Sequence, residues 1–342
     1  MSIAAVTHTL NLRPGAADRT LMLAQEKCRL VTRSDFDGLV CAMLLTDLGL
    51  IDEIAFVHPK DMQDGKIPIT DRDITTNLPY VEGARLVFDH HASEVLRAGR
   101  DGGRAEASKV RENHVIDADA PSAARVVYDY YGGAETFPGI DPDLMDAVDK
   151  ADAAQFTLEE ILHPKGWVLL NFLMDARTGL GRFHQFRISN YDLMMELIEA
   201  CKRLPIAEVL ALPDVRERVE VYFQQEELFR DQLRRCSEVY DNLVVVDLRG
   251  EEVIHAGNRF VVYALHPECN ISAHVMPGKQ GLNTVFAIGH SILNRSSSVD
   301  VGELMLRYGG GGHQAAGTCQ VPHEDAERVL AELIEHITTA DG

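Results

Sequence analysis

The sequence has no long apolar run, and its six cysteines form no CxxC pair. No apolar stretch approaches the roughly 18 residues that a membrane-spanning helix needs. The first residues lack a positive patch followed by a continuous apolar segment, so they do not predict a secretion signal. Cysteines without paired spacing are typical of a reducing compartment and argue against a thiolate zinc site. We therefore expect a cytoplasmic protein that does not associate with a membrane.

Basic residues are scarce, because 33 Lys and Arg face 53 Asp and Glu, for a net charge of −20. Proteins that coat long nucleic acid draw their affinity from many Lys and Arg at phosphates, so we do not expect long duplex DNA as a partner. A local positive or metal-filled cleft can still attract a small anion against the global field. The charge balance thus favours small anionic substrates over long polyanions.

The composition is that of a folded globular protein of about two domains. The chain has 342 residues, of which 46% are hydrophobic and 25% are charged. This length is ample to bury a core without disulfides or structural metals. The apolar content is too high for general disorder.

The first half alternates β-branched runs with helical stretches, which is typical of an α/β domain with a parallel sheet. The expected strands are Cys28–Thr32, Ile54–Val57, Ile74–Thr76, Arg85–Phe88 and His114–Ile116. The expected helices are Leu39–Leu48, one that begins near Pro121, and Asp143–Ala154.

The second half begins with a helical region, 157–240, and continues with strands. An apolar stripe that begins at Val215 and recurs at spacings of 3, 4 or 7 predicts one long helix reaching Tyr240. The expected strands that follow are Leu243–Val246, Phe260–Ala264, Ile271–Val275 and Thr284–Ile288, with a closing helix at Asp325–Ile337. We predict two α/β domains, 1–200 with a mainly parallel sheet and 241–342 with a smaller mixed sheet, joined by a helical linker at 201–240.

Carboxylates and imidazoles follow two of the expected strands. Asp35 and Asp37 come just after the first strand, and Asp89, His90 and His91 come at the end of the fourth. Ligands bind beyond the carboxyl ends of strands in an open parallel sheet, and these donor types suit manganese, iron, zinc or magnesium. A D-x-D pair alone is more often a helix cap, and a His-His pair alone is weak evidence. Together, at two strand ends, they favour a metal site.

Three segments carry a resemblance to a known family. SDFDGL, FDHHASE and, about 220 residues later, GGGHQAAG resemble the motifs of DHH superfamily phosphoesterases with a DHH-associated C-terminal domain. GHSILNRSS and the DFDG form of the first motif further resemble its exopolyphosphatase-related branch and the nanoRNase/pAp phosphatases. The resemblance implies a DHH catalytic domain that binds metal and a C-terminal domain that binds substrate.

The resemblance also implies a set of metal ligands. The five residues at matching positions are Asp35, Asp37, Asn77, His90 and Asp152. Asn77, in DITTNLP, stands where the superfamily usually has an aspartate that bridges two metals, and Asp71 or Asp73 would fill this role in another register. Asp152, in DAAQF, matches the last ligand, with Asp149 as the alternative.

Arg33 departs from the family pattern, because the superfamily usually has a histidine shortly before its first aspartates. An arginine keeps its proton and cannot ligate a cation. We therefore expect one firmly bound divalent ion, manganese first, with magnesium, cobalt or zinc as alternatives. Arg33 would supply the positive charge of the second ion and grip a phosphate.

The expected catalytic residues are Asp37, His91 and Arg33. Asp37 would orient the attacking water, His91 would stabilise phosphoryl oxygens or help the leaving group, and Arg33 would offset the developing negative charge.

The expected substrate-binding residues are Arg295, Gly310, Gly311, Gly312 and His313. A glycine run exposes backbone N–H groups and can form an anion-binding nest, although glycines alone more often make a tight turn. Arg295 is a candidate phosphate-binding residue, and an exposed surface arginine is nearly as good an interpretation.

Three functions follow from the sequence. The first is a metal-dependent phosphoesterase acting on small phosphorylated nucleotides or short oligonucleotides. The second is an exopolyphosphatase- or pyrophosphatase-like hydrolase of phosphoanhydrides. The third, suggested by Arg33 and Asn77, is a nucleotide-binding regulatory protein with an impaired centre. The resemblance also leaves a homodimer open.

Overall fold

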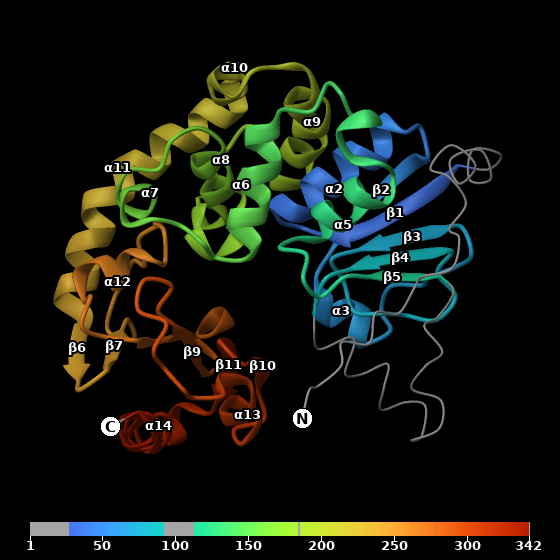
Figure 1. Cartoon of the computed structure of the whole chain (residues 1–342). Helices are drawn as coiled ribbons and strands as arrows, with labels where there is room; N and C mark the ends of the chain where they lie inside the picture. The colour runs from blue at the N-terminus through green and yellow to red at the C-terminus, as the bar shows by residue number, and fades with distance from the viewer. Residues whose placement is uncertain (1–26, 92–112, 184, 342) are drawn as a thin grey trace, which may run out of the picture. The chain divides into compact units, whose positions relative to one another are not determined.

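The chain forms two compact units, Met1–Asp149 and Lys150–Gly342, each with its own sheet (Figure 1). The computed structural model describes residues 27–91, 113–183 and 185–341. The predicted fold class, two α/β domains, is confirmed. The expectation about a secretion signal falls on the first residues, outside these ranges. Among the described helices, none combines the length and apolar character needed to cross a membrane.

The first unit is built on a five-stranded sheet in which every neighbouring pair is parallel. Its strands are β1 (Cys28–Arg33), β2 (Ile51–Val57), β3 (Asp73–Thr76), β4 (Leu86–Asp89) and β5 (His114–Ile116), in the order β2-β1-β3-β4-β5. All five strands were predicted from their β-branched runs. The central strand β3 is buried along its whole length, as expected where a parallel sheet is covered on both faces.

Helices α2 (Phe36–Asp47) and α5 (Ala123–Tyr130) pack together on one face of this sheet (Figure 1). The first ten residues of α2 are all buried. This explains why the sequence of α2 is a continuous apolar run and not an apolar stripe along one face. The short helix α3 (Pro59–Gln63) packs on Val31 through Met62. The next helix, α6 (Pro142–Asp152), follows α5.

The register of β1, β3 and β4 aligns their carboxyl ends. Thr32 of β1 pairs with Thr76 of β3, and Thr76 pairs with Phe88 of β4. The buried hydroxyls of Thr32 and Thr76 lie 2.7 Å apart and tie the two strands together. The residues that follow this row, among them Arg33 and Asn77, therefore emerge side by side at one edge of the sheet.

The second unit begins with the last residues of α6 and continues with the predicted helical region. Its helices are α7 (Leu158–Leu162), α8 (Gly166–Met174), α9 (Asn190–Arg203), α10 (Ile206–Ala211) and α11 (Pro213–Cys236). The long helix predicted to reach Tyr240 ends at Cys236, because Ser237–Tyr240 form strand β6 and pair antiparallel with the next strand. The predicted domain boundaries at 200 and 240 remain predictions.

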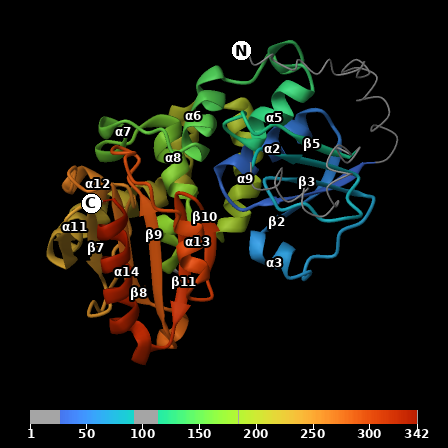
Figure 2. The same ribbon diagram turned by 60° about the horizontal axis from the view of Figure 1, so that its bottom comes forward.

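The sheet of the second unit is mixed. Its strands are β6 (Ser237–Tyr240), β7 (Leu243–Asp247), β8 (Ile271–Pro277), β9 (Thr284–His290), β10 (Gly311–His313) and β11 (Ala316–Val321), in the order β10-β11-β9-β8-β7-β6. Of these pairings, β7 with β8 is parallel and the others are antiparallel. Helices α13 (Val301–Leu306) and α14 (Ala326–Ala340) cover one face, where they close an apolar core (Figure 2).

One predicted strand, Phe260–Ala264, is wrong, because these residues form helix α12 (Val261–Leu265). The side-chain oxygen of Asn258 accepts the backbone N–H of Phe260 at 3.0 Å and starts a turn. The hydroxyl of Tyr263 then donates to the carbonyl of Gly289 on the sheet at 2.8 Å. Tertiary contacts thus override the β-branched composition of this segment.

Backbone geometry requires glycine at most positions of the run Gly309–Gly312. Gly309 has φ +72°, a conformation that glycine adopts without strain. A Cβ on Gly312 would lie 2.2 Å from the carbonyl oxygen of Ala316, because β10 and β11 approach closely there. A Cβ on Gly311 would meet nothing within 4 Å. The run is thus a tight connection into a strand, and Gly311 is its open position.

We predict that Gly312→Ala lowers the free energy of unfolding by about 1–3 kcal/mol, because the added methyl group collides with backbone. Gly311→Ala is the matched control and should leave stability nearly unchanged. Urea denaturation followed by circular dichroism measures both. Equal losses in the two variants would contradict this account of the hairpin.

A second prediction concerns Asp73 at the start of β3, which is 1% exposed and binds Arg29 through two bonds of 2.7 and 2.9 Å. Burial on its own would raise the pKa of the Asp73 carboxyl, but hydrogen bonds from Arg29 and Thr70 outweigh it and lower the pKa. A lowered folded-state pKa stabilises the protein at neutral pH, and this contribution is lost as the pH falls below about 4.

Asp73→Asn should therefore cost about 1.5–3 kcal/mol at pH 7 and progressively less toward pH 3. Urea unfolding across this pH range is the measurement. The exposed Asp61, paired with Lys66, provides the control Asp61→Asn, which should change little. A pH-independent loss in Asp73→Asn would show that the carboxylate charge is not the cause.

Candidate metal centre

The turn between β1 and α2 is held by Asp35. Its side chain caps the helix by accepting the backbone N–H of Gly38 at 3.0 Å, and its other oxygen pairs with Arg33 Nε at 2.8 Å. A Cβ on Gly38 would lie 1.9 Å from the carbonyl oxygen of Arg33, so the chain can turn this sharply only with glycine there. Asp35 is therefore engaged in the helix cap that the D-x-D pattern alone suggests.

Asp37 lies one residue into α2 and is directed at the start of another helix. Its carboxylate accepts the backbone N–H groups of Ala123 at 3.1 Å and Ala124 at 2.7 Å, at the N-terminus of α5. Unsatisfied N–H groups at a helix N-terminus favour a negative charge. The side chain is 2% exposed, so these bonds fix the orientation of a buried carboxylate. A carboxylate has about four lone-pair sites, which leaves room for a cation.

The DHH motif at the end of β4 contains a rigid hydrogen-bond arrangement. One oxygen of the fully buried Asp89 accepts the backbone N–H groups of His90 and His91 and lies 2.7 Å from Nδ1 of His91. Nδ1 of His90 lies 3.2 Å from the carbonyl oxygen of Ala120. A carbonyl can only accept, so this contact places the His90 proton on Nδ1 and the lone pair on Nε2.

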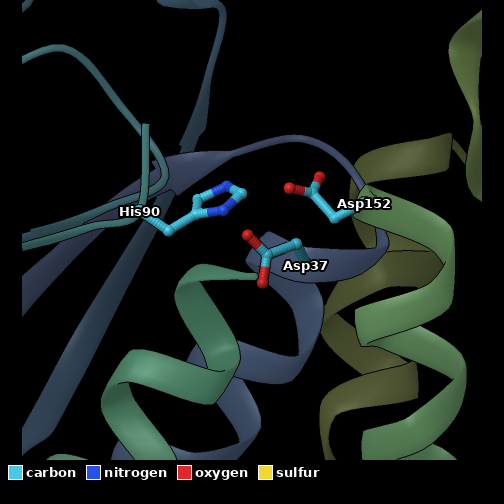
Figure 3. Close-up of side chains that lie close together, drawn as sticks. All are labelled: Asp37, His90 and Asp152. Carbon is cyan, nitrogen blue, oxygen red and sulfur yellow. The ribbon is translucent and has the colours of Figure 1, made fainter. Parts of the chain in front are cut away.

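Asp152 is the last residue of α6, a helix fixed by the salt bridge of Asp149 to Arg125 at 2.6 Å. Ligand atoms of Asp37, His90 and Asp152 all lie within 4.8 Å of one another. Figure 3 shows the three side chains pointing toward a common centre. Two carboxylates and an imidazole in this geometry fit a divalent cation. The carbonyl contact on the second nitrogen of His90 is the support that metal-ligating histidines usually have.

The other two residues expected to hold metal, Asp35 and Asn77, form a separate hydrogen-bonded group with Arg33. Asn77 Nδ2 donates to Asp35 Oδ1 at 3.4 Å. Asn77 is 1% exposed and has φ +53°, and its Oδ1 is buried with no hydrogen-bond partner among the residues that the structure describes. Within this group, the Asn77 Oδ1 is the atom that could serve as a neutral metal ligand.

The alternative ligands are placed elsewhere. Asp73 lies at the opposite end of β3 in its ion pair with Arg29, and Asp71 is exposed in the turn before that strand. Asp149 pairs with Arg125 and accepts the hydroxyl of Ser122 at 2.7 Å. Asn77, not an aspartate, therefore follows the carboxyl end of β3.

The expected substrate-binding residues lie in the second unit. Gly311, Gly312 and His313 form β10, with His313 exposed at its end, and Gly310 precedes that strand. Arg295 lies in the loop after β9, and its Nη2 donates to the carbonyl of Ala154 at 2.9 Å.

Two supports of the centre were missed by sequence reasoning. They are the N–H groups of Ala123 and Ala124, which bind Asp37, and the carbonyl of Ala120, which contacts His90. All three are backbone groups, so no residue type marks them. The helix start predicted at Pro121 was the available signal, because a helix N-terminus beside the expected acidic edge is an anion site.

Comparison with solved structures places the chain among phosphoesterases. The structure of PggH from Vibrio cholerae, a pGpG-specific phosphodiesterase, is 60% identical, with a TM-score of 0.78 over 92% of this chain and 100% of that one. CDC45 from Entamoeba histolytica shares the fold at 9% identity and a TM-score of 0.51, over 94% of this chain and 98% of that one.

A RecJ structure from Thermus thermophilus in complex with Mg²⁺ also matches, at 16% identity and a TM-score of 0.48, over 95% of this chain and 52% of that one. No family model and no curated protein matches the chain. The match to PggH covers nearly the whole chain, and the fold agrees with the resemblance seen in the sequence. This chain belongs to the DHH superfamily of phosphoesterases.

Proposed function

We propose that this protein is a divalent-metal-dependent phosphodiesterase acting on small phosphorylated nucleotides or short oligonucleotides, with pGpG as the first substrate to test. The observation that carries the proposal is the convergence of Asp37, His90 and Asp152 at the carboxyl edge of a parallel sheet. The 60% identity to a pGpG-specific phosphodiesterase supports the substrate class. The acidic balance of the chain agrees with a small substrate rather than long nucleic acid.

The proposed chemistry divides between the ion and the chain's own residues. A divalent ion held by Asp37, His90 and Asp152 would supply a Lewis acid that polarises a phosphoryl oxygen. Asp89 orients the ring of His91 through Nδ1. When the ring carries a proton on both nitrogens, its Nε2–H would donate to phosphoryl oxygens or pass its proton to the leaving oxygen. His91 is about a quarter exposed, which leaves its ring accessible to a substrate.

Arg33 supports a centre with one firmly bound ion. Its guanidinium pairs with Asp35, so a positive charge already lies beside the carboxylate that would otherwise attract a second cation. A guanidinium presents five donors and can bind a phosphate while it keeps one carboxylate contact. We take manganese as the ion to test first, with magnesium, cobalt and zinc as alternatives.

We predict that the purified protein with Mn²⁺ hydrolyses pGpG, and that Asp37→Ala and His90→Ala lower kcat/KM by more than about 100-fold. Even the outer partners of metal ligands cost 10–100-fold when mutated, so loss of a ligand should cost at least as much. Product chromatography with pGpG, pAp, a short RNA, pyrophosphate and polyphosphate measures this. Asp231→Ala, on the exposed face of α11, is the control and should be fully active.

Other outcomes of this assay select other functions. Fast turnover of polyphosphate or pyrophosphate, with none of nucleotides, would assign the phosphoanhydride hydrolase. Nucleotide binding without turnover in any metal would assign a regulatory protein with an impaired centre. Full activity in Asp37→Ala and His90→Ala would contradict the proposed centre itself.

The proposal of one bound ion is tested separately by substituting Asp35 and Asp37, which lie two residues apart. Isothermal titration with Mn²⁺ should give one tight site per chain in the wild type and in Asp35→Asn, because asparagine can still cap α2. Asp37→Asn should abolish the tight site, because it removes a ligand charge. Two tight ions per wild-type chain, or equal losses in both variants, would contradict the assignment.

A further inference from the structure

The end of helix α6 is built on a strained turn. The N–H of Gln155 donates to the carbonyl of Lys150 at 2.8 Å, and that of Ala154 donates to Ala151 at 3.2 Å. This pair of bonds is the Schellman arrangement, in which the residue after the cap is left-handed and is usually glycine. Here that residue is Ala154, with φ +51°. Asp152 is the last helical residue before this turn.

An alanine in the left-handed region is unfavourable, since its Cβ crowds the following carbonyl. Such a residue persists only where its surroundings hold it. Beyond the turn, the buried Phe156 packs against Phe172 and Phe260, with ring centroids 4.9 and 5.8 Å apart. These contacts anchor the chain after the turn, whereas the carbonyl groups of Ala153 and Ala154 belong to the turn itself.

Those two carbonyl groups are held by Arg295. Its Nη2 donates to the carbonyl of Ala154 at 2.9 Å and lies 3.5 Å from that of Ala153. Its Nε lies 3.4 Å from the carbonyl of Ile292 in its own loop, which directs the guanidinium. A positive charge at a helix C-terminus also complements the helix dipole. Arg295 therefore stabilises the turn through both hydrogen bonds and charge.

We propose that Arg295 is a positioning residue for Asp152: it holds the left-handed turn at Ala154 and so fixes where α6 ends. This inference rests on the proposed role of Asp152 as a metal ligand. Without Arg295, the turn after α6 loses the hydrogen bonds to the carbonyls of Ala153 and Ala154, and the Asp152 carboxylate is then held less firmly within reach of Asp37 and His90. A residue that acts in this way affects metal binding before any substrate arrives.

The experiment measures the Kd for Mn²⁺ in the nucleotide-free protein. Mn²⁺ is titrated into the protein, and binding is monitored by calorimetry and by the electron paramagnetic resonance signal of free Mn²⁺. Arg295→Ala should raise the Kd for Mn²⁺ about 10-fold, the lower end of the effect of outer partners of metal ligands. Arg295→Lys keeps the charge and one donor nitrogen but loses the planar fork of the guanidinium, so it should recover part of this affinity. Arg203→Ala, an exposed arginine on α9, is the control for lost charge and should leave the Kd unchanged.

The sharpest test is a second substitution at the turn. Ala154→Gly in the Arg295→Ala background should restore most of the Mn²⁺ affinity, because glycine adopts the left-handed conformation without strain. An unchanged Kd in Arg295→Ala, with a raised KM for pGpG, would overturn the proposal and make Arg295 a phosphate contact. If Asp152→Asn also leaves the Kd for Mn²⁺ unchanged, Asp152 is not a metal ligand and the proposed ligand set is contradicted. If Asp152→Asn weakens Mn²⁺ binding but Arg295→Ala does not, only the positioning role of Arg295 is contradicted.

Discussion

The centre depends on three parallel strands that end in register. Because β1, β3 and β4 are neighbours with aligned ends, the chain leaves the sheet three times at one edge, and each exit carries polar side chains. The buried hydroxyl contact between Thr32 and Thr76 fixes two of these strands one step before the edge. A slip of one residue in this register would turn the side chains at the edge to the opposite face.

Backbone groups hold this edge in shape as much as side chains do. The start of α5 binds Asp37, a carbonyl just before it contacts His90, and the N–H groups after β4 bind Asp89. Each of these partners is part of a helix cap or strand end, so the acidic side chains are stabilised without a matching number of basic residues. This is how a chain with a net charge of −20 can keep buried carboxylates at one place.

The sequence predicted the fold class and every strand of the first sheet, because β-branched runs between turn residues mark buried parallel strands. It also named Asp37, His90 and Asp152, which lie together, although their role as ligands stays a prediction. It failed where tertiary contacts decide: Phe260–Ala264 is helical, and β6 interrupts a continuous apolar stripe. The direction of Arg295, toward two carbonyls, depends on packing that no local pattern records.

The ion pair of Arg33 and Asp35 has a consequence for how the protein meets a changing environment. A cation that belongs to the chain cannot dissociate, be chelated or be exchanged for another metal. The positive potential at this end of the sheet therefore has two sources. The Arg33 guanidinium is always present, whereas a bound divalent ion is present only when metal is available. Scarcity of metal would remove only the contribution of the bound ion.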